Sequence, residues 1–181
     1  MNEASEDSYR ARVAIRLATV SDAPMLARFR YDFRSSLGAV RENEVDFVQR
    51  CSSWMQERLA ADSPWKCWIA ELDQTPIGHL WSQIIEKISN PTIEPEHHVY
   101  LTNFYVREEA RAGGIGSMLL SVALDWIRTH DVNAVILWPT ERSRSLYQRH
   151  GFAVRPDLME LIVAPDGDPD SSASGSVKSN R

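Results

Sequence analysis

The residues best suited to chemistry form a glycine-rich turn, RAGGIGS, at positions 111–117. This turn stands between an apolar run and an amphipathic run, so backbone N–H groups are expected unpaired at the positive end of a helix dipole. Gly113, Gly114 and Gly116 lack the β-carbons that would keep an anion from the backbone. The Ser117 hydroxyl and the arginine that opens the turn add to the same group. The spacing predicts a phosphate-binding turn.

Three kinds of phosphate-binding turn share this composition, and their spacing separates them. The Walker pattern requires a lysine, but none occurs between Arg107 and Asn133. The dinucleotide pattern GxGxxG, started at Gly114, would require a small residue where Leu119 stands, and no βαβ unit opens the chain. The third pattern, Arg/Gln-x-x-Gly-x-Gly/Ala, is matched in full by residues 111–116.

Strands and helices must position this turn, and their order indicates the fold class. Apolar and β-favouring runs predict strands at 13–18, 66–72, 76–85, 98–106, 134–138, 152–155 and 158–163. Helical periodicity and capping residues predict helices at about 22–36, 44–61, 115–127 and 143–150. This order predicts an α/β (α+β) domain with a mixed sheet of about six to seven strands and about four helices. A polar loop with two prolines, at 86–97, interrupts the pattern.

Three segments together resemble the GCN5-related N-acetyltransferase (GNAT) superfamily. They are the strand HVYLTNFYV at 98–106, the turn with its helix, and SLYQRHGF at 145–152, which is similar to the family's Leu-Tyr-x-x-x-Gly-Phe signature. The resemblance implies one GNAT domain over residues 12–163, with the sheet splayed at its central parallel pair. It implies acetyl-CoA as co-substrate, with its pyrophosphate on the main-chain N–H groups of Arg111, Ala112, Gly113, Gly114, Ile115, Gly116 and Ser117. The end of the preceding strand, Phe104, Tyr105 and Val106, would pair with the pantetheine arm.

The resemblance also suggests how acetyl transfer would proceed. It places Tyr147 beside the thioester sulfur, as the acid that protonates the leaving thiolate. A phenol of pKa about 10 and a thiol of about 8.5 differ by an amount that costs about 2 kcal/mol. Thr140 stands where the family often has an asparagine, which puts one side-chain contact to the cofactor in doubt. The general base stays open among His98, Tyr100, His97, Glu96, Glu86 and water.

Two functions follow as hypotheses. The first is an acetyl-CoA-dependent N-acetyltransferase in which a primary amine of a small molecule or peptide attacks the thioester directly. The alternative is a non-catalytic acyl-CoA-binding sensor or interaction module of the same fold. The sequence does not name the acceptor, and it leaves open whether two copies pair through the edge of the last strands.

Composition narrows the setting. The 181 residues are 43% hydrophobic with a net charge of -5, which suits one globular domain and disfavours nonspecific nucleic-acid binding. No apolar run is long enough to predict a membrane span. Cys51 and Cys67 show no metal-ligand or disulfide spacing, so neither a metal nor a disulfide framework is expected. The acidic start favours a cytoplasmic protein, with residues 1–11 flexible and 164–181 a disordered tail.

Overall fold

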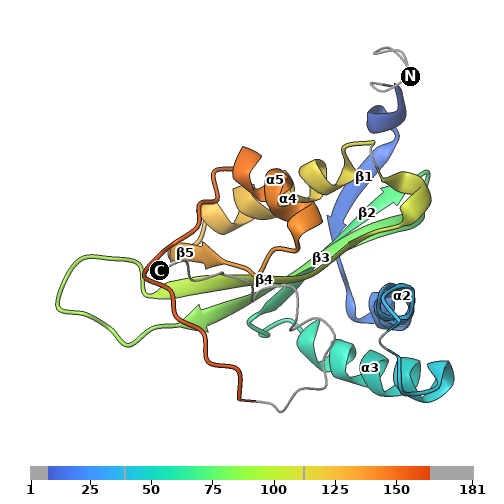
Figure 1. Cartoon of the computed structure of the whole chain (residues 1–181), viewed down its shortest axis with the longest axis horizontal. Helices are drawn as coiled ribbons and strands as arrows, with labels where there is room; N and C mark the ends of the chain where they lie inside the picture. The colour runs from blue at the N-terminus through green and yellow to red at the C-terminus, as the bar shows by residue number, and fades with distance from the viewer. Residues whose placement is uncertain (1–7, 39, 112, 164–181) are drawn as a thin grey trace, which may run out of the picture.

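A mixed five-stranded sheet forms the centre of the computed structural model, which describes residues 8–38, 40–111 and 113–163. The strands lie in chain order across the sheet (Figure 1). The first three neighbouring pairs are antiparallel and the last pair is parallel. The strands are β1 (Val13–Leu17), β2 (Trp65–Leu72), β3 (Thr75–Glu86), β4 (His97–Val106) and β5 (Val132–Ile136).

Helices cover both faces of the sheet. The main ones are α2 (Ala23–Ser36), α3 (Glu44–Arg58), α4 (Ile115–Arg128) and α5 (Arg144–Arg149). Short 3-10 turns, η1 (Val20–Asp22), η2 (Glu108–Ala110) and η3 (Glu141–Ser143), connect them to the strands. Residues 8–11 are also helical, which makes five helices in the described residues rather than the four predicted. Figure 1 shows α2 and α3 on one face, with α4 on the other.

Alternation along β2 divides the core into two layers. Trp68 belongs to the cluster that contains the apolar stripe of α4, whereas Ile69 belongs to the cluster that contains Leu26 of α2 and Met55 of α3. Successive side chains of a strand point to opposite faces of the sheet, so a strand that is buried on both faces is apolar throughout. The predicted strands 66–72 and 76–85 are confirmed as β2 and β3, which lie between the two layers of helices and are slightly longer than predicted.

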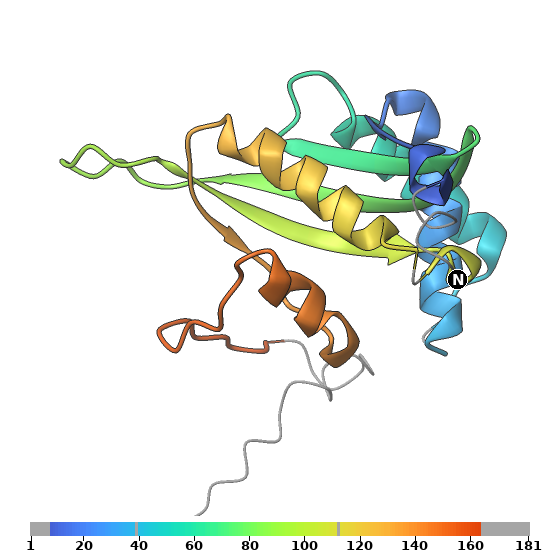
Figure 2. The same ribbon diagram turned by 90° about the horizontal axis from the view of Figure 1, so that it is seen from above.

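The parallel pair is short. β4 pairs with β5 only from His97 to Tyr100, so residues 101–106 of β4 have no partner strand on this side within the described residues. Figure 2 shows the two strands diverging beyond this pairing. A splayed parallel pair agrees with the expected arrangement, but the pair lies at the edge of the sheet rather than at its centre.

The two strands predicted after α5 are not formed. Residues 152–155 and 158–163 are irregular, and most of their apolar side chains lie exposed, with Val154 at 75% and Met159 at 93%, whereas Phe152 packs against the core. A turn at Pro156, closed by the Leu158 N–H to the Arg155 carbonyl (3.4 Å), separates the two segments as a hairpin turn would. The prediction of six to seven strands was wrong because β-favouring side chains form a strand only where a neighbour completes the hydrogen-bond ladder.

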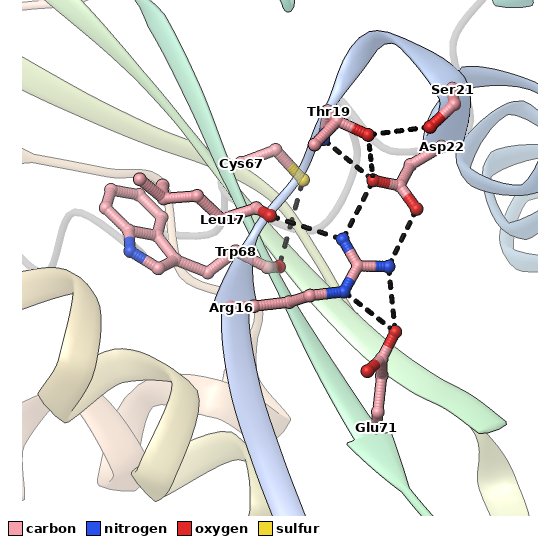
Figure 3. Close-up of polar contacts among 8 residues, drawn as sticks. All are labelled: Arg16, Leu17, Thr19, Ser21, Asp22, Cys67, Trp68 and Glu71. Carbon is pink, nitrogen blue, oxygen red and sulfur yellow. Dashed lines mark hydrogen bonds and ion pairs between the residues drawn. The ribbon is translucent and has the colours of Figure 1, made fainter. Parts of the chain in front are cut away.

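A network of ion pairs and hydrogen bonds holds the residues that lead into α2. The Arg16 guanidinium donates to both carboxylate oxygens of Asp22 (2.8 Å each) and through Nε to Glu71 Oε1 (2.9 Å). Asp22 also accepts from the Thr19 backbone N–H (2.7 Å) and hydroxyl (2.9 Å), which caps η1 (Figure 3). The Arg16 cation, followed by the Thr19 hydrogen bonds, lowers the pKa of Asp22 to about 2.

We expect Asp22→Asn to lower the free energy of unfolding by about 1 kcal/mol at neutral pH. A carboxyl whose pKa is lower in the folded state stabilises the fold above its unfolded pKa, near 3.8, and loses that contribution as pH falls toward 2. Urea unfolding across this range should therefore show the two proteins converging in acid. Asp157→Asn, at the exposed Asp157–Arg155 pair, is the matched control and should match the wild type throughout. A deficit of equal size at pH 2 and 7 would contradict the assignment.

Candidate functional site

The glycine-rich turn ends where α4 begins. Gly114 is the N-cap, with φ of 79°, and its carbonyl accepts from the Met118 N–H (3.1 Å). A left-handed backbone of this kind is readily adopted only by glycine. Among the described residues, no backbone acceptor takes up the N–H groups of Gly116 and Ser117. The Ser117 N–H, whose i−4 carbonyl belongs to the described Gly113, therefore remains able to bind an anion at the positive end of the α4 dipole. Ala112 lies outside the described residues.

The three glycines of the turn have different neighbours. A β-carbon at Gly113 would lie 2.7 Å from Tyr9 Cε1, and one at Gly114 would lie 3.0 Å from Arg10 Nη2. Packing of the N-terminal residues therefore accounts for these two glycines. A β-carbon at Gly116 would meet only ordinary contacts, at 3.5 Å from Leu146 and 3.6 Å from Phe104. Packing within the described protein does not require glycine at Gly116.

Arg111 and Ser117 already have protein partners. Arg111 Nε donates to the Val106 carbonyl (3.0 Å), and its Nη1 lies 3.6 Å from Glu108 Oε1, so the side chain braces the turn against the end of β4. The Ser117 hydroxyl lies 3.1 Å from His150 Nε2. His150 Nδ1 lies 2.9 Å from the Leu146 carbonyl. A carbonyl only accepts, so the Nδ1–H donates to it. The Ser117 hydroxyl thus already has the His150 ring as a hydrogen-bond partner.

His150 was not singled out from the sequence as a site residue. Its Nε2 also lies 3.3 Å from the Ser121 hydroxyl, so one imidazole ties two serines of α4 to the last turn of α5. The side chain thereby joins the helix that carries the glycine-rich turn to the helix that carries Tyr147. The sequence feature that could have indicated such a contact is the spacing of Ser117 and Ser121, which lie one helical turn apart.

A bulge in β4 lies next to the turn. The pairing of β4 with β3 shifts between Thr102 and Tyr105, and Asn103 has a φ of 47°. Past the bulge, Phe104 packs against the core cluster under α4, whereas Tyr105 contacts Phe29 of α2 (ring centroids 5.7 Å apart). The edge of β4 that faces away from β3, at 101–106, has no β5 partner. An extended chain with donors and acceptors could pair with this edge.

Tyr147 lies on α5, close to Phe104 of this β4 edge. It projects from α5, is 8% exposed, and its ring centroid lies 6.3 Å from that of Phe104 and 5.6 Å from that of Phe152. Burial, with a smaller contribution from Tyr100, raises the pKa of Tyr147 to about 12. The phenol therefore stays protonated and neutral throughout the physiological range.

Comparison with known proteins identifies the fold. The model of the acetyltransferase (GNAT) family matches residues 30–152. The chain belongs to the GNAT family. No curated protein matches it.

Solved structures resemble this GNAT chain over most of its length. A predicted acetyltransferase from Clostridium acetobutylicum, solved with acetyl-CoA, has 21% identity and a TM-score of 0.68, over 83% of this chain and 96% of its own. A GCN5-related N-acetyltransferase from Ralstonia eutropha has 22% identity and a TM-score of 0.65, over 84% and 99%. An aminoglycoside acetyltransferase from an uncultured soil metagenomic sample, in complex with sisomicin, has 13% identity and a TM-score of 0.67, over 86% and 98%. At these identities the likeness shows the fold.

The candidate bases of this GNAT domain are spread along β4. Tyr100 lies near Tyr147 and packs edge-on against Trp138 (5.1 Å between centroids). Glu86 and His97 pair at the opposite end of β4 from the glycine-rich turn, and Glu96 and His98 adjoin them. The seven residue steps along the strand from His97 to Phe104 span about 23 Å. Among the candidate bases, Tyr100 is the one that the structure places near Tyr147.

His79, a buried histidine on β3, was not predicted from the sequence as a site residue. His79 is fully buried, and its ring stacks on Phe29 (5.8 Å between centroids) and lies near Tyr105 (5.9 Å). Burial, opposed in part by Asn103, lowers its pKa to about 4, so the imidazole is neutral. The sequence feature that could have indicated a buried histidine is its place inside the largely apolar run PIGHLWS.

Two classes of site are not seen in the described part of the chain. No cluster of three or more His, Cys, Asp or Glu side chains there has the arrangement to hold a metal ion. None of the helices described has both the length and the apolarity needed to cross a membrane.

Proposed function

We propose that this GNAT protein transfers the acetyl group of acetyl-CoA to a primary amine of a small molecule or peptide. The observation that carries the proposal is the edge of β4 at 101–106, which has no partner strand on the β5 side among the described residues and leads toward the start of α4, where the Ser117 N–H has no described backbone acceptor. Membership of the family supports acetyl-CoA as the donor. We also propose a cytoplasmic setting, in which the free Cys51 and Cys67 stay reduced.

The residues present fit acetyl-CoA. Backbone N–H groups of the turn, from Ala112, Gly113, Gly114, Ile115, Gly116 and Ser117, would hold its phosphates, whereas the Arg111 N–H already donates to the Glu108 carbonyl (3.2 Å). The edge formed by Phe104, Tyr105 and Val106 would pair with the pantetheine arm. The position that a β-carbon would take at Gly116 lies 3.5 Å from Leu146 of α5 and 3.6 Å from Phe104 of β4, so the start of α4 approaches both elements here. When bound, acetyl-CoA supplies the activated acetyl group as a thioester.

Tyr147 acts in this proposal as a hydrogen-bond donor at the sulfur. With its pKa raised to about 12, full proton transfer to a thiolate of pKa near 8.5 would cost about 5 kcal/mol, rather than the 2 kcal/mol expected for an ordinary phenol. A cost of that size favours a donated hydrogen bond that strengthens as negative charge develops. Burial of Tyr147 excludes water that would weaken this bond.

The acceptor amine must be neutral to attack. Deprotonating a lysine-like amine costs about 4 kcal/mol near neutral pH, whereas an amine of pKa near 8 costs about 1 kcal/mol. Glu86, Glu96, His97 and His98 lie toward the far end of β4, whereas Tyr100 lies near Tyr147. We therefore propose that the amine loses its proton to water, with Tyr100 as the remaining side-chain candidate, and that acceptors of low amine pKa react fastest.

A thiol-release assay with acetyl-CoA tests the function. We expect release of free CoA thiol with selected members of a panel of small amines, amino acids, aminoglycosides and peptides, and faster turnover for amines of low pKa. Isothermal titration with CoA provides a separate readout of binding. Binding without thiol release across the panel would support the acyl-CoA-binding sensor instead. Absence of CoA binding would contradict both.

A further inference from the structure

The N-terminal helical residues lie directly on the glycine-rich turn. Tyr9 is partly buried and packs against the core cluster under α4, with its ring over Gly113. Arg10 is exposed, and its guanidinium lies over Gly114, with Nη2, Nε and Cζ at 3.0, 3.2 and 3.4 Å from the position that a β-carbon would take. These residues precede β1, at the end of the molecule where α4 begins (Figure 1). A partly buried tyrosine thus anchors an arginine at the N-cap of α4.

The position of Arg10 is electrostatically unfavourable unless an anion binds there. The N-terminus of a helix carries about half a positive charge, so a cation beside it is repelled. No described acidic side chain forms an ion pair with Arg10. Arg12, two residues later, is paired with Asp73, and Arg111 is held by Val106 and Glu108. Within the described residues, Arg10 is therefore the cation at this turn whose charge is not already matched.

We propose that Arg10 is a further ligand of coenzyme A and binds its diphosphate. This inference rests on the proposed function, because it takes acetyl-CoA as the occupant of the turn. A guanidinium donates to phosphate oxygens through a fixed fork of N–H groups. At Gly114 it stands beside the backbone N–H groups of the turn, so both would act on the same phosphates. The arginine that sequence spacing assigned to this task, Arg111, instead braces the turn.

The test compares donors that carry different phosphates. Binding of acetyl-CoA, acetyl-dephospho-CoA, which lacks the ribose 3′-phosphate, and S-acetylpantetheine, which lacks the diphosphate together with the adenosine 3′-phosphate, is measured by titration calorimetry. Arg10→Ala should weaken acetyl-CoA and acetyl-dephospho-CoA about 10-fold and leave S-acetylpantetheine unchanged. Arg10→Lys should recover part of the affinity. Arg12→Ala, an exposed arginine on the same segment, is the control and should bind all three as the wild type does.

The outcomes separate this inference from the function on which it rests. The Arg10→Ala deficit should shrink at high ionic strength, since an exposed charge pair is screened, and the melting temperature should not change. Unchanged affinity of Arg10→Ala for acetyl-CoA would overturn the inference while the function stands. An equal loss for S-acetylpantetheine, or a loss confined to acetyl-CoA alone, would also overturn the diphosphate assignment. If the wild type bound none of the three donors, the proposed function would fail first.

Discussion

Replacing Tyr147 by phenylalanine is expected to lower kcat about 100-fold, the size seen when one preorganised donor to a developing negative charge is removed. The ring contacts with Phe104 and Phe152 are kept, so the fold and the KM for acetyl-CoA should stay within about twofold of the wild type. A fall in kcat without a rise in KM identifies an interaction made mainly in the transition state. Steady-state thiol release with a reactive amine provides both constants.

The pH profile of the wild type separates Tyr147 from an ordinary titrating acid. Because burial raises the pKa of Tyr147 to about 12, its proton is retained through the whole range in which the protein can be assayed. Activity should therefore rise with pH as the acceptor amine loses its proton, with no loss from Tyr147 below about pH 11. A loss of kcat near pH 10 that disappears in Tyr147→Phe would contradict the burial argument.

Tyr31→Phe is the matched control for this substitution. It removes a hydroxyl from a tyrosine on α2 that packs against Phe47 and has no place in the proposed site. Its kcat should equal that of the wild type. If Tyr147→Phe also retained full kcat, the hydrogen bond to sulfur would be wrong, and the edge of β4 and the turn would have to account for catalysis without it.

Local patterns in the sequence were sufficient for the elements that form the proposed cofactor site. The stripe of α4, from Ile115 through Ile127, follows helical periodicity strictly enough to predict the helix, and the glycines before it mark its start. The half-buried strand β4 is rich in aromatic and branched residues and free of glycine and proline, so it was also predicted closely. Both depend on neighbours in sequence, which a single chain displays directly.

Contacts between distant segments were not accessible in the same way. Nothing in the sequence near Tyr9 and Arg10 indicates that they cover Gly113 and Gly114, because that contact joins residues about a hundred positions apart. The bond between Ser117 and His150 likewise depends on how α5 docks on α4. Residues 158–163 show the converse, since their strand-like composition has no partner strand in the described structure.

Gly116→Ala is expected to change stability and cofactor affinity in opposite directions. Alanine is favoured over glycine in a helix by up to about 1 kcal/mol, and its β-carbon would meet Leu146 and Phe104 at ordinary contact distances. The free energy of unfolding should therefore stay equal or rise. The same methyl group would occupy space between α5 and β4 and shield the N–H groups of the turn. Loss of a charge-assisted hydrogen bond of about 1.5–3 kcal/mol would weaken acetyl-CoA about 10- to 100-fold.

Gly116→Val extends the same argument, because its second methyl group would fill more of that space and should abolish measurable binding. Val122 is a 38% exposed residue of α4. Val122→Ala raises helix propensity without touching the turn, so this variant should gain stability and keep full affinity. Urea unfolding and titration with acetyl-CoA measure the two quantities on the same samples. An alanine at Gly116 that lowered stability and affinity together would show that the position serves packing alone. Unchanged affinity would show that the phosphates of the donor do not approach the start of α4 at all.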